Sequence, residues 1–309
     1  TVELDIEDLI QEEEVVVTVS HAVYIKRLPA NVYRSQRRGG KGITGVIPRE
    51  EDFLENIFVT STHSYMLFFT DRGRVYWLKV YEIPEGGRTA KGKALVNLIR
   101  MSAEEKVTAM IPIRDFAAIE KGMSLIMITE KGVVKKTALD EYDNPRPSGI
   151  IAVKLVPGDK LIEVKQGTGD KYIFMATRMG KAAVYPEKEV RDMGRNAQGV
   201  RGIKLAKDDV VVGADLVCNE ENILTVTELG LGKRTQIKEY RKTHRGAKGV
   251  INIKITDKNG PVVGIKKIDS DNDIMLMSTQ GMAIRLPVKN ISVIGRATQG
   301  VRLFRLEEG

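Results

Sequence analysis

The residues of this chain best suited to chemistry form a basic, glycine-rich run, Gln36-Arg37-Arg38-Gly39-Gly40-Lys41-Gly42. The run combines three cations, three glycines and one amide, and it contains no bulky apolar side chain. Glycine lets a backbone adopt positive φ and approach another molecule closely, and the arginine guanidinium offers a planar fork of donors that fits a phosphate. The run is therefore suited to lie against a polyanion, although a solvated basic surface loop has the same composition.

The same run does not match a nucleotide-binding P-loop, which has the form Gly-x-x-x-x-Gly-Lys-Ser/Thr. Ser35 stands at the first glycine position, and Gly42 replaces the hydroxyl residue. The three histidines are scattered and the single cysteine, Cys218, follows an apolar run, so the pattern of a zinc site is missing. We therefore expect neither a catalytic residue nor a metal or cofactor site in this chain.

Composition narrows the class of protein. The chain has 309 residues, of which 42% are hydrophobic and 29% charged, which is typical of a folded globular protein. No apolar run reaches membrane-spanning length. A single cysteine excludes an internal disulfide framework and fits a reducing compartment. We expect a cytoplasmic protein without a membrane partner.

The charge of the chain favours nucleic acid as a partner. The net charge is +8, but the first fourteen residues hold seven acids and no base, which leaves +15 on the remainder. A domain this basic, with a pI near 9.3, is typical of nucleic-acid-binding proteins. The alternative is a basic enzyme that carries its charge for solubility.

An internal repeat predicts the fold. Six segments share a hairpin pattern, in which a β-rich run is followed by a turn and then by a run with basic residues. In five copies the turn carries a glycine, at a position that suits the left-handed residue of a short hairpin; in the first copy we expect Ala22 to stand there. The five glycines are Gly73, Gly132, Gly180, Gly230 and Gly281, separated by 59, 48, 50 and 51 residues.

A second landmark keeps the same period. A basic, glycine-containing loop follows each hairpin by roughly 17 to 20 residues and leads into a short β-rich run. The aligned glycines of these loops are Gly42, Gly92, Gly149, Gly199, Gly249 and Gly300, separated by 50, 57, 50, 50 and 51 residues. Because two separate features repeat together, the period predicts six structural units.

The predicted fold class is all-β. The pattern predicts about four strands in each unit. Four-stranded sheets bury both faces when several of them pack around an axis. We therefore predict a six-bladed, propeller-like disc made of one domain, with repeats at 1–56, 57–106, 107–157, 158–207, 208–258 and 259–309. The first unit lacks an apolar lead strand apart from residues 5–10, so we expect this N-terminal run to pair with the last blade and close the ring.

On such a disc the six basic loops are expected to fall on one circumference. A positive rim could follow a DNA duplex, because each neutralised phosphate adds affinity by counterion release without reading sequence. Aromatic residues make up only 6% of the chain, which disfavours single-strand binding by base stacking. The third loop has a single cation and two prolines. Besides the run 36–42, the predicted rim cations are Arg88, Lys91, Lys93, Arg146, Arg195, Arg201, Arg241, Lys242, Arg245, Lys248, Arg296 and Arg302.

The run Gln36–Gly42 resembles the complete gyrase A box, and the six-unit pattern resembles the C-terminal domain of the A subunit of bacterial DNA gyrase over essentially the whole chain. The resemblance implies a β-pinwheel, in which neighbouring blades exchange strands. It also implies that duplex DNA wraps the basic rim in a positive sense and presents a transport segment, so that gyrase introduces negative supercoils. The box, carried over onto Gln36, Arg37, Arg38, Gly39, Gly40, Lys41 and Gly42, would be needed for that wrap.

The resemblance further implies the partners of the domain. They are double-stranded DNA, the remainder of gyrase A, and gyrase B in an A2B2 holoenzyme in the bacterial cytoplasm, with the isolated domain monomeric. ATP and magnesium would be used elsewhere in the parent enzyme, and this domain would not be an enzyme by itself. Two alternatives stay open: a DNA-bending domain of the topoisomerase IV type, and a propeller that acts as a protein-interaction scaffold.

Overall fold

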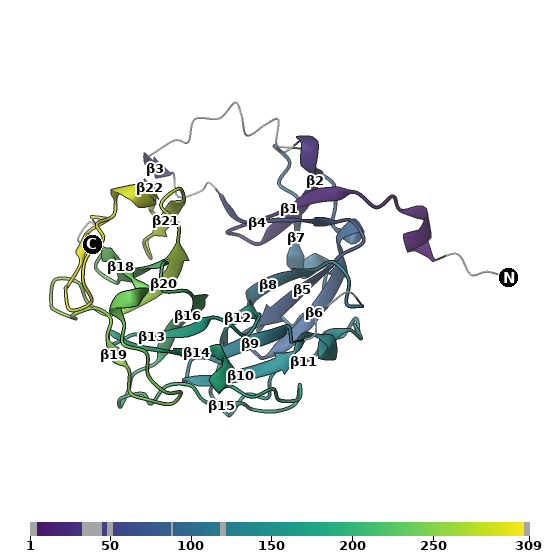
Figure 1. The fold of residues 1–309 in the computed structure, drawn as a ribbon. Coiled ribbons are helices and arrows are strands. Elements are labelled where there is room, and N and C mark those ends of the chain that lie inside the picture. The colour runs from purple at the N-terminus through teal and green to yellow at the C-terminus, as the bar shows by residue number, and fades with distance from the viewer. Residues whose placement is uncertain (1–4, 33–44, 48–51, 88, 118–121, 306–309) are drawn as a thin grey trace. The chain divides into compact units, whose positions relative to one another are not determined.

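The computed structural model describes residues 5–32, 45–47, 52–87, 89–117 and 122–305. These residues form β-strands, single-turn 3-10 helices and a helical turn at 30–32, so the all-β prediction is confirmed. The chain divides into two compact units (Figure 1). The box residues 36–42 and Arg88 lie outside the described residues.

The first unit comprises residues 1–42, 50–120 and 139–152 and contains two four-stranded antiparallel sheets. The strand orders are β4-β1-β2-β7 and β11-β6-β5-β8. Its core packs Val17, Met66 and Phe68, all fully buried, against residues that follow the second hairpin, such as Leu95. The strands are β1 (Glu14–Ser20), β2 (Tyr24–Pro29), β4 (Leu54–Ser61), β5 (Tyr65–Thr70), β6 (Arg74–Lys79), β7 (Lys93–Ala94), β8 (Val107–Ile113) and β11 (Ile150–Ile151).

The second unit comprises residues 43–49, 121–138 and 153–309 and contains three four-stranded sheets and one three-stranded sheet among its described residues. The orders are β12-β9-β10-β15, β16-β13-β14-β19, β20-β17-β18-β23 and β21-β22-β3. The strands are β3 (Gly45–Ile47), β9 (Ser124–Thr129), β10 (Val133–Ala138), β12 (Leu161–Gly167), β13 (Tyr172–Thr177), β14 (Lys181–Pro186), β15 (Val200–Arg201), β16 (Val211–Val217), β17 (Asn222–Thr227), β18 (Leu231–Gln236), β19 (Val250–Ile251), β20 (Val262–Ile268), β21 (Asp273–Met277), β22 (Ala283–Pro287) and β23 (Val301–Arg302).

Single-turn 3-10 helices follow most hairpins, a feature that the sequence analysis did not predict. They turn the chain away from the second hairpin strand toward the basic loop, and their first residues are buried in several repeats, as at Val80, Ile237 and Val288. The helices are η1 (Ile6–Leu9), η2 (Val80–Glu82), η3 (Leu95–Asn97), η4 (Leu139–Tyr142), η5 (Glu187–Glu189), η6 (Ile237–Glu239) and η7 (Val288–Asn290).

The hairpin turns follow the predicted chemistry, with one correction. The turn glycines of five hairpins have φ between +75° and +87°, the left-handed region that glycine adopts without steric cost. In the first hairpin the residue at this position is Val23, with φ +63°, and not Ala22. The Val23 N–H donates to the Ser20 carbonyl at 2.9 Å, as the Gly73 N–H does to Thr70 at 3.0 Å. The first turn therefore holds a β-branched residue in a costly conformation.

Strands are exchanged between repeats, as the resemblance implied. In each four-stranded sheet the hairpin is flanked on one side by the long strand of the following repeat and on the other by a two-residue strand from that repeat's basic loop. In the sheet of the last hairpin, the flanking strand is β3, which follows the basic loop of the first repeat; Ala283 pairs with Ile47 and Arg285 with Gly45. Each repeat therefore donates its loop strand to the sheet of the preceding hairpin, and the first repeat donates its strand to the sheet of the last hairpin.

The expectation that residues 5–10 pair with the last sheet is wrong. Residues Ile6–Leu9 form η1 within the first unit. The Glu7 carboxylate lies 3.2 Å from the Lys79 ammonium, and the His63 ring lies 2.7 Å from the Ile10 carbonyl oxygen. An ion pair with β6 and a hydrogen bond from the turn before β5 therefore hold this acidic run. The strand that pairs with the last hairpin is β3, which lies beside β22.

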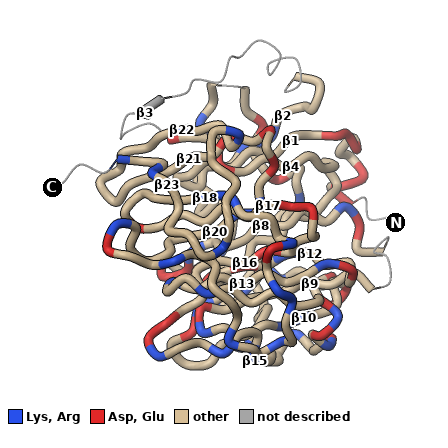
Figure 2. Tube along the Cα trace, turned by 60° about the vertical axis from the view of Figure 1, so that its left-hand side comes forward, with Lys and Arg blue, Asp and Glu red and all other residues tan. Residues whose placement is uncertain are grey.

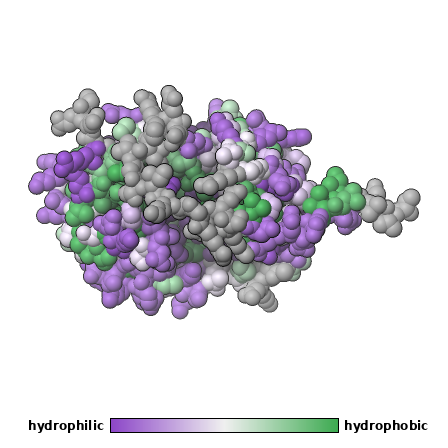
Figure 3. All heavy atoms as spheres, turned by 90° about the horizontal axis from the view of Figure 1, so that it is seen from above, coloured by the Kyte–Doolittle hydropathy of each residue, from purple (hydrophilic) through white to green (hydrophobic). Residues whose placement is uncertain are grey.

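The N-terminal segment also carries exposed apolar side chains. Figure 3 shows a mostly hydrophilic face with a hydrophobic group beside the N-terminal end, where Ile6 and Leu9 are 67% and 74% exposed. Among the described residues, no helix is long and apolar enough to cross a membrane.

Candidate nucleic-acid interface

The basic loops are fixed at equivalent places in the sheets because each ends in a donated strand. Lys93 pairs with Ile25 of β2, Val200 with Val134 of β10, and Val250 with Ala182 of β14. These two-residue strands stand at the end of each sheet, next to the second hairpin strand. The glycine before each strand makes the approach possible: Gly92 has φ +83°, and a Cβ atom there would lie 2.4 Å from the Ile25 carbonyl oxygen.

The described rim cations fall into two groups. Seven side chains are exposed and can meet a polyanion directly: Lys91, Lys93, Arg146, Arg201, Arg241, Lys248 and Arg302. Four are half-buried: Arg195, Lys242, Arg245 and Arg296. In the second unit, Lys and Arg recur along the loops beside β15 and β23, interspersed with acidic segments (Figure 2).

Three of the half-buried cations bind backbone carbonyl groups. The Arg245 Nη1 donates to the Arg201 carbonyl at 2.7 Å. Arg296 donates from Nε to Glu239 and from Nη1 to Ile251, both at 2.8 Å. Each of these arginines therefore ties its own loop to the donated strand of the preceding repeat. A guanidinium has five donors, so such anchoring leaves further N–H groups for a phosphate.

Lys242 uses two of its three ammonium donors within the protein, a larger share than these arginines use. Its ammonium donates to the carbonyl oxygens of Ile237 and Tyr240 at 3.0 and 3.1 Å and lies 5.2 Å from the centroid of the Tyr172 ring. Burial lowers its pKa. These contacts make Lys242 a cap for the end of η6 more than a free cation, which the sequence pattern did not reveal.

The fifth loop is fixed by an acid from the preceding repeat. One Glu189 oxygen accepts from the Arg245 N–H at 2.7 Å, and the other lies 2.9 Å from Nδ1 of His244. Burial raises the pKa of Glu189, but the hydrogen bonds from Arg245 and His244 outweigh it, so the net shift is downward. The carboxylate is therefore ionised at neutral pH and positions a loop that otherwise carries cations.

Basic pairs in three second strands were not recognised as internal by the sequence analysis. They are Lys26-Arg27, Lys135-Lys136 and Lys233-Arg234. Arg27 and Arg234 donate through Nε to the carbonyl oxygens of Ile83 and Ile291, both at 2.7 Å. Both acceptors directly follow a single-turn helix of the next repeat. The sequence did indicate that these pairs are not loop cations, because each pair lies within a predicted strand and outside the glycine-containing loops.

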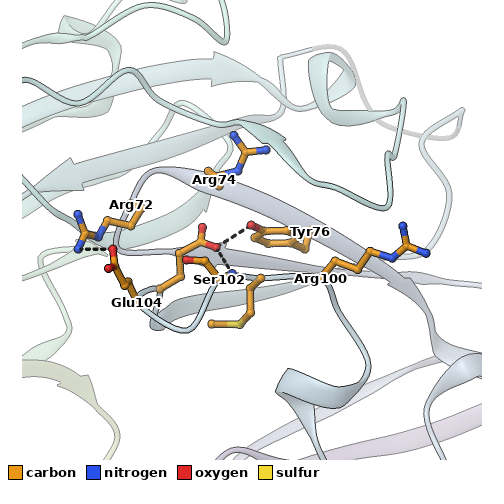
Figure 4. Close-up of a pocket in the computed structure, with 8 residues that line it drawn as sticks. Arg72, Arg74, Tyr76, Arg100, Ser102 and Glu104 are labelled. Carbon is orange, nitrogen blue, oxygen red and sulfur yellow. Dashed lines mark hydrogen bonds and ion pairs between the residues drawn. The ribbon is translucent and has the colours of Figure 1, made fainter.

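A basic hollow of about 370 Å³ lies in the first unit, beside the third loop (Figure 4). Arg74 donates to the carbonyl oxygens of Ser148 and Gly149 at 2.9 and 3.1 Å. The hollow is lined by Arg72, Arg74, Tyr76, Arg100, Met101, Ser102, Glu104 and Glu105.

Part of the charge in this hollow is already paired. Glu105 is buried and accepts from Tyr76 and from the Ser102 N–H, both at 2.7 Å, while Arg72 lies 3.8 Å from Glu104. Burial raises the pKa of Glu105, but these hydrogen bonds outweigh it and lower the pKa overall. Three arginines against two glutamates leave the lining net positive. The Arg74 guanidinium binds carbonyl groups of the third loop, and the Arg100 guanidinium points away from Glu104 (Figure 4).

Within the described part of the chain, no group of three or more His, Cys, Asp or Glu residues could hold a metal ion. Cys218 is half-buried, and burial raises the pKa of its thiol.

Comparison with known proteins decides the family. The family model of the DNA gyrase C-terminal domain, beta-propeller, matches residues 14–61, 64–114, 124–166, 171–218, 221–269 and 272–309. The chain belongs to this family. The matched segments number six, one for each sequence repeat, whereas the described residues form five four-stranded sheets and one of three strands.

Curated relatives agree with this membership. The gyrase A protein of Halalkalibacterium halodurans is 55% identical over 303 residues, which cover 98% of this chain and 36% of that protein. The gyrase A protein of Salmonella typhimurium is 47% identical over 306 residues, covering 99% of this chain and 34% of that protein. The chain therefore corresponds to a domain that spans about a third of the length of these topoisomerase subunits.

Solved structures show the same fold in two enzymes. A crystal structure of the C-terminal domain of DNA topoisomerase IV superposes with a TM-score of 0.83 at 25% identity, covering 96% of this chain and 90% of that chain. A structure of a DNA gyrase A C-terminal domain gives a TM-score of 0.71 at 24% identity, covering 96% of both chains. The fold is thus shared by gyrase and topoisomerase IV domains and does not by itself distinguish them.

Proposed function

We propose that this chain binds duplex DNA without sequence preference along its basic loops and wraps it in a positive sense. The wrap presents a transport segment to the remainder of gyrase A, so that the holoenzyme introduces negative supercoils with ATP turnover on gyrase B. The observation that carries the proposal is the repeated placement of a basic loop at one end of each four-stranded sheet by a donated strand.

The wrap requires the six sheets to act as blades of one disc, which is part of the proposal. The cyclic donation of loop strands supports it, because the first repeat supplies β3 to the sheet of the last hairpin. On a disc, equivalent loops lie on one circumference. Bending a duplex around it costs up to about 10 kcal/mol for a sharp bend over a short site, so many phosphate contacts are needed to offset that cost.

The third loop carries only Arg146, yet the second repeat adds charge beside it. Arg72, Arg74 and Arg100 line the hollow next to residues 148–149. We propose that a DNA phosphate occupies this hollow, so that the duplex keeps contact with the disc where the loop itself is poor in cations.

The proposed partners follow from family membership. They are duplex DNA, the remainder of gyrase A, and gyrase B in an A2B2 assembly within the bacterial cytoplasm, with the isolated domain monomeric. ATP and magnesium act in other parts of that assembly under this proposal.

A topoisomerase IV-type function, in which the domain bends DNA without handed wrapping, is the second candidate. The TM-score of 0.83 with a topoisomerase IV domain favours it. The intact sequence Gln36–Gly42 and the 46–55% identity to several gyrase A proteins favour gyrase.

DNA binding is tested by fluorescence anisotropy with a labelled linear duplex and a single strand of equal length, at several salt concentrations. We expect tighter binding of the duplex and a steep decrease of log K with log salt, because several phosphates are neutralised. Weak binding with little salt dependence would contradict the proposal and support the scaffold alternative.

A further inference from the structure

Three lysines occupy one equivalent position in the hairpins. Lys26, Lys135 and Lys233 are each the third residue of a second hairpin strand, in β2, β10 and β18. Two of them, Lys135 and Lys233, have no solvent exposure. A buried ammonium group is costly unless its hydrogens are donated to acceptors, so these lysines require partners inside the protein.

The partners are backbone carbonyl groups of the basic loops. Lys26 donates to the carbonyl oxygens of Gly87 and Ala90 at 2.9 and 2.7 Å. Lys135 donates to the Arg195 carbonyl at 2.5 Å. In each case the loop belongs to the next repeat along the chain, and its strand is donated to the sheet that contains the lysine.

The ammonium group of Lys233 makes three hydrogen bonds. It donates to the carbonyl oxygens of Gly295 and Arg296 at 2.8 and 2.6 Å, and to Oγ1 of Thr298 at 3.1 Å. An ammonium group has three donors, so all three are used within one turn. Burial, together with the nearby Arg296 guanidinium, lowers the pKa of Lys233 to about 8, and the group is still protonated at neutral pH.

The other two four-stranded sheets fix their loops differently. Tyr76 stands at the equivalent position in β6, and its hydroxyl donates to Glu105 of its own repeat. The third loop is held instead by Arg74, which donates to the carbonyl oxygens of Ser148 and Gly149. Ala183 stands there in β14 and has no side-chain donor; the loop that it faces is held by Glu189. The loops of the second, fourth and sixth repeats therefore accept hydrogen bonds from a buried or half-buried lysine, and the loops of the third and fifth repeats are held by other side chains.

We propose that Lys26, Lys135 and Lys233 are positioning residues that order the basic loops of the second, fourth and sixth repeats before DNA binds. This inference rests on the proposed function. The lysines fix the backbone that carries Lys91, Arg195 and Arg296, and they do not touch DNA themselves. A loop that is already ordered loses less conformational entropy on binding.

The test compares Lys233→Met with Lys238→Met in the 309-residue chain at neutral pH. Both variants lose one lysine, but Lys238 is exposed on η6. Hydrogen exchange is measured for residues 295–300 and 241–249, and duplex affinity is measured over a range of salt. We expect faster exchange in 295–300 only, and a several-fold higher Kd with an unchanged salt slope, for Lys233→Met alone.

Two results would overturn the proposal. One is unchanged exchange in residues 295–300. The other is a salt slope that falls by about 0.9, because that is the loss of one phosphate contact and would place Lys233 on the DNA. If Lys233→Met does not fold, Lys26→Met decides, since Lys26 is only half-buried and its loss should speed exchange in residues 89–93. If the unsubstituted chain does not bind duplex, the proposed function fails, while the exchange data still test the ordering role.

Discussion

A Cβ atom on Gly249 would lie 2.4 Å from the carbonyl oxygen of Ala182. The two residues belong to different repeats, and the contact stands where β19 joins β14. Gly249 also has φ +80°, which favours glycine over every residue with a side chain. The repeated glycine of the basic loops therefore allows the loop strand to pair closely with the sheet of the preceding repeat.

Replacement of Gly249 by alanine should lower the free energy of unfolding by at least about 1 kcal/mol, because alanine is strained at positive φ and also meets the Ala182 carbonyl. Urea denaturation at one pH measures the change. Gly87→Ala is the matched control, since nothing lies within 4 Å of the position of its Cβ atom. Equal midpoints for the two variants would show that β19 tolerates a side chain at its start.

Replacement of Gln36–Gly42 by alanines should abolish negative supercoiling by the reconstituted holoenzyme while leaving much of the duplex affinity intact. The reason is that the other basic loops still neutralise phosphates, whereas the family resemblance assigns handed wrapping to the box. Supercoiling of relaxed plasmid with ATP is the measurement. Full supercoiling by the variant would refute the role given to these residues.

Replacement of Arg88, Lys91 and Lys93 together should weaken duplex binding and flatten the salt dependence. Lys91 and Lys93 are exposed beside β7, and each lost phosphate contact lowers the slope of log K against log salt by about 0.9. A titration over salt with the unsubstituted chain as reference gives the slope. An unchanged slope would place the second loop away from the DNA path.

Stability should depend on pH through Glu163 in β12. Burial raises its pKa to about 7, with Asp215 adding to the effect and Lys165, 3.7 Å away, opposing it. The folded state therefore binds a proton more tightly than the unfolded state, whose pKa is near 4.5. The stability contributed by this group is present below about pH 4.5 and is lost as the pH rises through 7.

The variant Glu163→Gln should remove this dependence and be more stable than the parent chain at pH 8, by on the order of 1–3 kcal/mol. Denaturant unfolding at pH 5 and pH 8 measures both chains. Glu228→Gln, at an exposed site, is the control. A Glu163→Gln chain that loses stability at pH 8 would contradict the account.

The sequence alone was sufficient for the features set by local chemistry. The period of the turn glycines predicted the hairpins, and their positive φ values follow from short turns. The run that contains β3 follows Gly42, one of the periodic loop glycines, but its partner could not be predicted, because β22 is distant in the chain. For the same reason the acidic run 5–10 was assigned to the wrong partner.

The site was predicted only in outline. The structure places Lys93 and Arg201 in the donated strands β7 and β15, where both side chains are exposed. Lys242 and Arg296 instead bind backbone carbonyl groups. Lys233 was missed altogether, because a charged residue inside a strand gives no sign of which groups lie opposite it. The roles of the box residues and of the rim cations in DNA binding stay predictions.

The central claim, handed wrapping of duplex DNA, is tested most directly by linking number. The chain is mixed with relaxed circular plasmid, a nicking-closing topoisomerase is added, and the topoisomers are resolved after the protein is removed. We predict a shift toward positive linking number that is lost when Gln36–Gly42 is replaced. Binding without any change in linking number would contradict the claim and support a bending domain of the topoisomerase IV type.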